Sequence, residues 1–344
     1  MSNYRMPAEW EKHSATQLHW PSNRETWPGD RLERVEEVYS NVIEELHFYE
    51  PIHLFVENLE IRNRVMQKLA TRAVDLDRII IHQQKINDVW ARDCGPVFVQ
   101  KEDHYLITDW DYNAWGGKYP PWEDDNRLPA YIAQKHDIGR IQPGMILEGG
   151  SIDVNGAGAL LTTESVLLNP NRNPDLSKEK IEEKLENYLG ADQVIWLKNG
   201  LAGDDTDGHI DDITRFLNED TVLTMICEDP EDVNFAALEE NLEILKTVSL
   251  KDGRKLNIET LPLPQTKIEG TTVDGSEYVP ASYANFYIAN GVVLVPIYDK
   301  KHDRLALSLL KKYFPTRDVI GIKCGDLVWG QGSIHCITQQ WYGI

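Results

Sequence analysis

A thiol, an imidazole and a set of carboxylates in this sequence could together perform nucleophilic catalysis. The residues lie far apart along the chain and are Asp93, Glu148, Asp205, His209, Asp211 and Cys336. In such an arrangement the thiolate attacks an electrophilic carbon, the imidazole transfers protons, and a carboxylate orients the imidazole ring. The chemistry would need neither a metal ion nor an organic cofactor.

The surplus of carboxylates indicates which kind of carbon the thiol would attack. An acyl-transfer enzyme needs hydrogen-bond donors that stabilise an oxyanion, whereas carboxylates are acceptors and anions. A guanidinium group suits them because it is planar, permanently cationic and able to donate paired hydrogen bonds to carboxylates. We therefore expect two carboxylates to bind a guanidinium while Cys336 attacks its central carbon.

Taken one at a time, these residues have simpler structural explanations. A cysteine such as Cys336 is more often a buried packing residue, and His209 alone would be an ordinary loop or core histidine. The acidic run 204–207 is by default a solvated turn, while Arg92 and His335 are interpreted as structural. The functional interpretation therefore depends on where the residues lie within a repeated pattern.

A pattern of strand, short turn and strand recurs four times along the chain. One turn is Asn-Gly, which between two alternating apolar runs is the strongest short hairpin signal. The predicted hairpins pair residues 97–100 with 105–110, 159–162 with 166–169, 213–217 with 222–227, and 284–289 with 292–298.

Helical patterns and short apolar strands occupy the intervals between these hairpins. Apolar residues at i, i+3 and i+4 predict helices over 31–48, 59–70, 177–189, 232–247 and 304–313. Short strands are predicted to follow them at 52–56, 79–82, 194–197, 256–260 and 319–322. We expect about five such units in a single α/β catalytic domain spanning 1–344, with the stretch 263–280 as a lid.

Residues capable of chemistry precede each predicted hairpin and also lie near the end of the chain. The clusters are NDVWARD at 87–93, EGG at 148–150, DDTDGHID at 204–211, SY at 282–283 and GQGSIHCI at 330–337. If the units surround an axis, equivalent strand starts converge at one end of it. The five clusters would then share one central cleft.

The composition limits the partners that this chain could bind. Its 35 basic and 56 acidic residues give a net charge of −21, which opposes binding to nucleic acids and to anionic membranes. The same field favours a cationic ligand. No signal peptide or membrane-spanning run is recognised, and the four cysteines show no CxxC pair, so we expect free thiols and a cytoplasmic location.

Four ordered motifs closely resemble those of the agmatine deiminase family. They are NDVWARDCGP at 87–96, LEGG at 147–150, GDDTDGHID at 203–211 and GQGSIHCITQQ at 330–340. The opening MPAEW at 6–10 is similar to the N-terminus of that family, so the resemblance covers nearly the whole chain. One departure is GQGS at 330–333, where many relatives carry GGGN.

The resemblance implies a fold and a set of residue roles. The fold would be a five-bladed, pseudo-symmetric α/β propeller, as in the wider guanidine-modifying superfamily that includes bacterial-type peptidylarginine deiminases. The resemblance implies that Cys336 forms a covalent amidino-cysteine, that His209 is the general acid and base, and that Glu148 pairs with His209. It further implies that Asp93 and Asp211 bind the guanidinium. The reaction would supply polyamine and putrescine biosynthesis.

The residues beside the motifs favour one guanidine over another. Arginine carries a carboxylate that calls for a cation in the pocket, whereas agmatine carries a distal ammonium that prefers acids and aromatic faces. The flanking residues are Asp88, Trp90, Trp115 and Asp205, which favour agmatine. Alternatives left open are a peptidylarginine deiminase, a metallohydrolase that uses His209, Asp211, Asp212 and Glu148, and a polyamine- or sugar-binding protein without turnover. Homo-oligomerisation is also left open.

Overall fold

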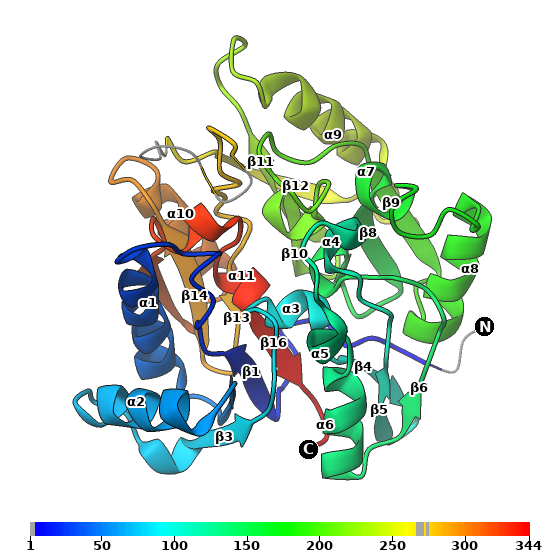
Figure 1. Cartoon of the computed structure of the whole chain (residues 1–344). Coiled ribbons are helices and arrows are strands. Elements are labelled where there is room, and N and C mark those ends of the chain that lie inside the picture. The colour runs from blue at the N-terminus through cyan, green and yellow to red at the C-terminus, as the bar shows by residue number, and fades with distance from the viewer. Residues whose placement is uncertain (1–3, 266–271, 273–274) are drawn as a thin grey trace.

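The strands of the described residues form five small β-sheets. The computed structural model describes residues 4–265, 272 and 275–344. The strand orders are β16-β1-β2-β3, β4-β5-β6, β7-β8-β9, β10-β11-β12 and β13-β14-β15. The sheets follow one another along the chain, and each with its helices forms one module of an α/β propeller (Figure 1).

Modules 1 and 2 contain the first six strands and the strand that ends the chain. The bounds in module 1 are β1 Ala15–His19, α1 Arg31–Leu46, β2 Ile52–Val56, α2 Leu59–Ala70, η1 Leu76–Arg78, β3 Ile79–Gln83 and β16 Thr338–Trp341. Those in module 2 are α3 Ala91–Cys94, β4 Val97–Lys101, β5 His104–Thr108, α4 Ala114–Gly117, α5 Glu123–Asn126, α6 Leu128–His136 and β6 Arg140–Ile141.

Modules 3 to 5 repeat this arrangement. The bounds in module 3 are η2 Gly149–Ser151, β7 Asp153–Val154, β8 Ala159–Thr163, α7 Glu164–Leu167, α8 Lys178–Leu189 and β9 Gln193–Leu197. Those in module 4 are η3 Ile210–Asp212, β10 Thr214–Asn218, β11 Thr221–Ile226, α9 Phe235–Thr247 and β12 Asn257–Pro262. Those in module 5 are β13 Tyr287–Ile288, β14 Val292–Ile297, α10 Asp303–Tyr313, β15 Asp318–Lys323, η4 Val328–Gly330 and α11 Ile334–Ile337.

Modules 2 to 5 share one connectivity, and module 1 adds to it the helix α2 and the parallel strand β3. An antiparallel pair is followed by a helix that returns the chain to a parallel neighbour, as in β10, β11, α9 and β12. In module 1 the antiparallel pair joins the two ends of the chain, because β1 pairs with β16. The propeller is therefore closed by the strand that directly follows α11.

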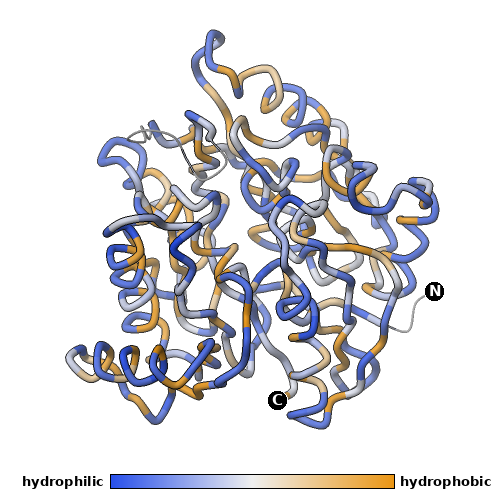
Figure 2. The backbone as a smooth tube through the Cα atoms, viewed as in Figure 1, coloured by the Kyte–Doolittle hydropathy of each residue, from blue (hydrophilic) through white to orange (hydrophobic). Residues whose placement is uncertain are grey.

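The helices form because their apolar residues recur on one face. In α1 the buried residues include Leu32, Val35, Tyr39 and Val42, and Figure 2 shows the alternation of hydrophobic and hydrophilic residues along this helix. In α8 the Ser177 side chain accepts from the Lys180 backbone N–H, and the helix ends at a left-handed glycine. The buried faces pack against the sheets of the modules.

The five expected units are confirmed, with one hairpin placed wrongly. The hairpins at 97–110, 213–227 and 284–298 form, but residues 166–169 do not form a strand, because α7 begins at Glu164. The antiparallel partner of β8 is β7, and the turn between them contains Asn155, whose side chain accepts from two backbone N–H groups. Asn155 and Gly156 form an Asn-Gly pair, which is typical of tight hairpin turns.

Two features bear on the expected surroundings of the site. Eight of the 18 residues of the predicted lid at 263–280, namely 266–271 and 273–274, lie outside the described residues. None of the helices in the described part of the chain combines the length and apolar character needed to cross a membrane.

Candidate active site

Short helical turns that each precede a strand carry the candidate residues to the middle of the molecule. Asp93 lies in α3, Asp211 in η3 and Cys336 in α11, while Glu148 and His209 immediately precede η2 and η3. Figure 1 shows α3 and α11 side by side near the centre. The convergence expected from the repeat is therefore present in the structure.

The backbone at Gly150 marks the point where three of these side chains meet. A Cβ built there would lie 2.6 Å from His209 Nδ1, 2.8 Å from Asp93 Oδ1 and 3.0 Å from Asp211 Oδ2. His209 Nδ1 and Asp93 Oδ1 are themselves 3.6 Å apart. Only a residue without a side chain leaves this space open.

The nucleophile candidate is buried among hydrogen-bonding groups. The Cys336 thiol donates to Asp211 Oδ2 at 3.8 Å, and the Asn285 amide donates to Cys336 Sγ at 3.2 Å. Asn285 also donates to Asp212 Oδ1 at 2.9 Å. Burial raises the pKa of Cys336 well above its usual range, and the carboxylates of Asp211, Asp212 and Asp93 raise it further. The resting thiol is therefore protonated at neutral pH.

The two candidate guanidinium ligands are held by fixed partners. Asp93 accepts from the Gly150 backbone N–H and from Trp115 Nε1, each at 3.0 Å. Burial and then the Glu148 charge raise the pKa of Asp93 to about 7. Asp211 Oδ2 bonds His335 Nδ1 at 2.6 Å, and burial followed by Asp93 raises the Asp211 pKa well above its usual range. A bound cation would relieve this crowding of acids.

The imidazole and the third carboxylate are completely enclosed. His209 and Glu148 expose 1% and 0% of their surface. Burial and then the Arg172 cation lower the pKa of His209 well below its usual range, so the ring is neutral. Arg172 Nε donates to Glu148 Oε1 at 2.6 Å and its Nη2 donates to the Thr206 carbonyl at 2.9 Å. The structure thus pairs Glu148 with Arg172, and the expected Glu148–His209 hydrogen bond is not among the bonds of the described residues.

Several polar atoms around this point have no hydrogen-bond partner among the described residues. They are Glu148 Oε2, His209 Nδ1, His209 Nε2 and Asp211 Oδ1, all of them buried. Buried polar groups in folded proteins are nearly always paired, so such a concentration calls for an explanation. A ligand that donates N–H groups to the carboxylates and forms a hydrogen bond with the imidazole would give these atoms their missing partners.

A cavity of about 400 Å³ leads to Cys336. Asp88, Asp93, Trp90, Trp115 and Asp205, predicted from the sequence, all contribute to its lining. The ring centroids of Trp90 and Trp115 lie 6.3 Å apart, and the two indoles meet edge to face. Lining acids that sequence analysis did not single out are Glu25 and Asp125.

Not every lining acid is equally available to a ligand. The Asp88 carboxylate accepts from Thr26 Oγ1 at 2.6 Å and from Asn23 Nδ2 at 3.1 Å, so it orders the loop around it. Asp205 accepts from the Tyr119 hydroxyl. Lys118, which also lines the cavity, donates to Asp207 Oδ1 at 2.9 Å and to the Asp205 carbonyl. The positive charge of Lys118 is therefore already paired with the carboxylate of Asp207.

The sequence analysis gave no role in the site to three supporting residues, Asn285, His335 and Glu9. Asn285 takes the central position in module 5, where Ser282 and Tyr283 had been expected. Tyr283 instead donates to Asp303 at 2.9 Å, away from the thiol. His335, interpreted as structural, joins Asp211 to Glu9 through its two ring nitrogens, and Glu9 Oε2 lies 2.8 Å from His335 Nε2. No local pattern distinguishes these residues from ordinary loop positions.

The remaining structural interpretations agree with the geometry. Arg92 is buried and donates to Glu9 Oε2 at 3.3 Å. All four cysteines are free thiols. The departure at Gln331 falls on a backbone with φ of 79°, a left-handed conformation that glycine adopts freely, and Gln331 lines the cavity.

Relatives with this fold and sequence are known. A family model described as Porphyromonas-type peptidyl-arginine deiminase matches residues 5–341. A curated protein of Legionella pneumophila (strain Paris) with the name "Putative agmatine deiminase" is 38% identical over 98% of this chain and 95% of its own length.

Solved structures of named agmatine deiminases are similar to this chain in both sequence and fold. An agmatine deiminase of Enterococcus faecalis, described as catalysing its reaction, is 32% identical, with 98% of this chain and 96% of that chain covered and a TM-score of 0.89. A Cys-to-Ser variant of the C. jejuni agmatine deiminase with substrate bound is 30% identical, with 99% and 96% covered and a TM-score of 0.88. This chain belongs to the Porphyromonas-type peptidyl-arginine deiminase family.

Proposed function

We propose that this chain, acting as one catalytic unit, hydrolyses agmatine to N-carbamoylputrescine and ammonia. The observation that carries the proposal is the set of unpartnered, buried polar atoms of Glu148, His209 and Asp211, the last of which also accepts from the Cys336 thiol. These groups are suited to a planar donor of hydrogen bonds with a positive charge, which describes a guanidinium. The names of the relatives support the same reaction.

The reaction begins with activation of the thiol by the substrate. The guanidinium binds between Asp93 and Asp211 and offsets the negative charge that keeps Cys336 protonated. The thiol proton passes to neutral His209, and the sulfur attacks the central carbon with formation of a C–S bond. Because both partners are neutral before binding, charge separation occurs only when the cation is present.

The second half of the reaction releases two products. His209 gives its proton to one nitrogen of the tetrahedral adduct, and the C–N bond breaks. Ammonia departs, and the amidino carbon stays bonded to the sulfur of Cys336. His209 then removes a proton from water, which attacks the same carbon. The C–S bond breaks as the hydroxyl of the adduct gives up its proton and becomes the ureido carbonyl, and the thiolate takes a proton back from His209, which restores the neutral pair. Glu148 and Arg172 fix the position of the surrounding loops through their buried ion pair.

The cavity favours agmatine over arginine. Its lining includes the acids Glu25, Asp88 and Asp205, and the lining lysine, Lys118, is already bonded to acid and carbonyl groups. A distal ammonium would face these acids and the indoles of Trp90 and Trp115, whereas an α-carboxylate would meet like charge. The four free thiols, one of them the nucleophile, fit the cytoplasmic location that the sequence predicts.

One experiment tests the covalent mechanism. The protein is mixed with agmatine, quenched in acid within milliseconds to seconds, digested and examined by mass spectrometry. We expect a peptide containing Cys336 to gain the mass of agmatine less ammonia, because the amidino carbon on sulfur keeps its aminobutyl chain, and Cys336→Ser to form no adduct and release no ammonia. The matched control is Cys324→Ser, which removes another buried thiol and should leave adduct formation intact. Full turnover by Cys336→Ser would refute the proposal.

A second experiment separates the substrates. Peptidylarginine deimination is the rival, because the family model is described by that activity. Ammonia release is measured with agmatine, free arginine and a peptide with an internal arginine. We expect kcat/KM to be largest for agmatine by at least about a hundredfold, since burying an unpaired charge in the wrong pocket costs several kcal/mol. Preference for the peptide would overturn the assignment of substrate but not the chemistry.

A further inference from the structure

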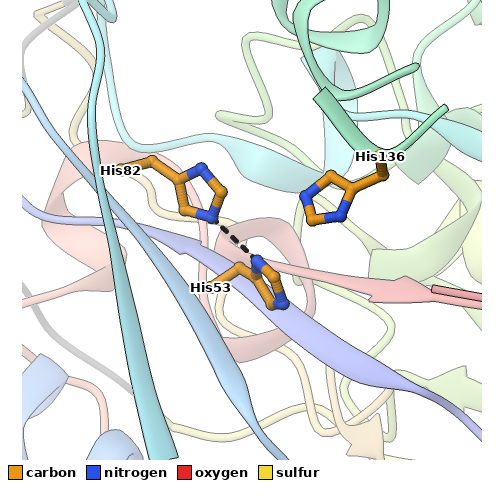
Figure 3. Close-up of side chains that lie close together, drawn as sticks. All are labelled: His53, His82 and His136. Carbon is orange, nitrogen blue, oxygen red and sulfur yellow. Dashed lines mark hydrogen bonds between the residues drawn. The ribbon is translucent and has the colours of Figure 1, made fainter. Parts of the chain in front are cut away.

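Three histidines gather in modules 1 and 2, away from the residues that surround Cys336. His53 lies in β2, His82 in β3 and His136 at the end of α6. One ring nitrogen of each lies within 4.8 Å of a ring nitrogen of the other two. Figure 3 shows the three rings arranged around a common space, with a hydrogen bond of 2.8 Å between His53 Nδ1 and His82 Nε2.

Aromatic side chains fix the rings that face this space. The His82 ring is stacked on Phe55 with centroids 4.5 Å apart, and the His53 ring lies 4.1 Å from that of Trp341. The His136 ring meets Trp341 edge-on at 5.4 Å. Because the rings are held by packing, the side chains lose little conformational freedom when a ligand binds, which lowers the entropic cost of binding.

The hydrogen bonds within the cluster leave one buried ring nitrogen without a partner among the described residues. His136 Nε2 is buried and has no partner among the described residues. His53 and His82 are buried, and the neutral imidazole nitrogens of such rings are common ligands of transition metals.

We propose that His53, His82 and His136 form a binding site for a divalent transition metal of the zinc class, which joins module 1 to module 2. Imidazole nitrogens suit Zn²⁺, Cu²⁺ and Ni²⁺, whereas Mg²⁺ and Ca²⁺ prefer oxygen ligands. Three histidines leave a fourth position of a tetrahedral zinc site for water. The site is separate from the proposed deimination, which uses none of its residues.

Metal binding requires a small rearrangement. Zinc–nitrogen bonds of about 2.0–2.1 Å place tetrahedral ligands about 3.3 Å apart, so His53 Nδ1 and His82 Nε2 must separate slightly from their present contact. The proton between them moves to the opposite nitrogen of its ring. Lys135 Nζ, which lies 3.0 Å from His82 Nδ1, must then give up that contact, because a protonated nitrogen no longer accepts. Lys135 therefore opposes metal binding.

The test measures Zn²⁺ binding to untagged, chelator-treated Cys336→Ser protein by calorimetry and by thermal unfolding. The Cys336→Ser background removes the thiol of a second cluster formed with Asp211 and Asp212. We expect one Zn²⁺ per chain and a higher Tm. His136→Gln should weaken binding at least tenfold, since even the loss of an outer-shell partner costs about 10–100-fold. His104→Gln, which changes an exposed histidine of β5, should leave binding unchanged.

Lys135→Met is the second variant and keeps all three ligands. Because it removes the competing cation, we expect tighter Zn²⁺ binding and a larger rise in Tm than in the parent. Co²⁺ in place of Zn²⁺ should give the visible spectrum of a nitrogen-ligated ion without a thiolate charge-transfer band. Zn²⁺ binding that survives His136→Gln, or that is absent from both the parent and Lys135→Met, would overturn the proposal.

Discussion

At the scale of residues, the site keeps its nucleophile inactive until a cation arrives. The Cys336 thiol lies among the carboxylates of Asp93, Asp211 and Asp212, which raise its pKa well above the usual range. Most cysteine enzymes lower this pKa with a neighbouring positive charge. Here the described residues place negative charge beside the sulfur, so the missing positive charge must come from the substrate.

The pH dependence of the thiol tests this idea. A raised pKa means that the thiol is protonated below that pKa and becomes a thiolate only as the pH rises through it. Alkylation of the free protein by iodoacetamide should therefore be slow at pH 7 and still rising at pH 9. A guanidinium ligand that does not react should lower the pKa and flatten the profile, as followed by thiolate absorbance near 240 nm. An identical titration with and without the ligand would rule out substrate-assisted deprotonation.

Asn285 provides a second prediction at this scale. Its amide donates to Cys336 Sγ and to Asp212, so Asn285→Asp would replace a donor with another acid of the same shape. We expect the thiol pKa to rise further and the alkylation rate at pH 8 to fall about tenfold for each pKa unit, with a similar loss in kcat.

The matched control is Asn241→Asp. Asn241 is also buried, in α9, where it bonds the backbone of Lys198 and Asn199. That change should destabilise the fold, because it buries a carboxylate, yet leave the thiol pKa of the folded protein unmoved. If the two variants shift alkylation equally, the contact between Asn285 and sulfur has no particular role.

The candidate catalytic residues could be predicted from the sequence because their types are uncommon and because their motifs occur in a fixed order along the chain. Asp93, His209, Asp211 and Cys336 were singled out because thiol, imidazole and acid recur at equivalent positions of a repeat, and the structure brings them together. Arg172 and Asn285 were not singled out, because their roles arise from tertiary contacts with residues distant in the chain. A lone arginine or asparagine in a loop has no periodicity or spacing that reveals its partner.

At the scale of elements, the short turns before the first strands determine the geometry. The turns α3, η2, η3 and α11 bring side chains and backbone N–H groups inward, and the strands that follow fix their position. Their glycines are part of the site, because the space next to Gly150 is occupied by atoms of His209, Asp93 and Asp211. A methyl group there would displace at least one of them.

Gly150→Ala is therefore expected to abolish most activity without unfolding the protein. A displacement of about 1 Å can reduce a rate about a hundredfold, so we expect kcat to fall by at least that factor. The control is Gly325→Ala, where a Cβ would meet no atom within 4 Å. Ammonia release and far-UV circular dichroism separate loss of geometry from loss of fold. Near-normal turnover by Gly150→Ala would show that the arrangement around this glycine is not the catalytic one.

The elements themselves were predicted where local and tertiary preferences agree. The five long helices and most of the strands formed as expected, because amphipathic spacing and turn residues act locally. The strand expected at 166–169 became α7, since its apolar residues Val166 and Leu167 are buried equally well by one helical turn. The two-residue strands β6 and β7 were missed, because pairs of residues carry no period.

At the scale of the whole molecule, closure of the propeller and catalysis depend on the same segment. The strand β16 pairs with β1 and directly follows α11, which carries Cys336. The position of the nucleophile therefore depends on contact between the two ends of the chain. This dependence follows from topology and could not be read from any single motif.

The net charge of −21 acts at the same scale and leads to the last prediction. A negative field should draw a dication toward the acid-lined cavity, and salt should weaken this attraction as the Debye length shortens from about 10 Å at 0.1 M to about 3 Å at 1 M. We expect kcat/KM for agmatine to fall several-fold over this range. A guanidine with an uncharged alkyl tail of the same length should show roughly half the slope on a logarithmic scale, because it carries one charge instead of two. Equal slopes for both substrates would mean that the distal ammonium does not sense the field, and that the acids lining the cavity serve structure more than recognition.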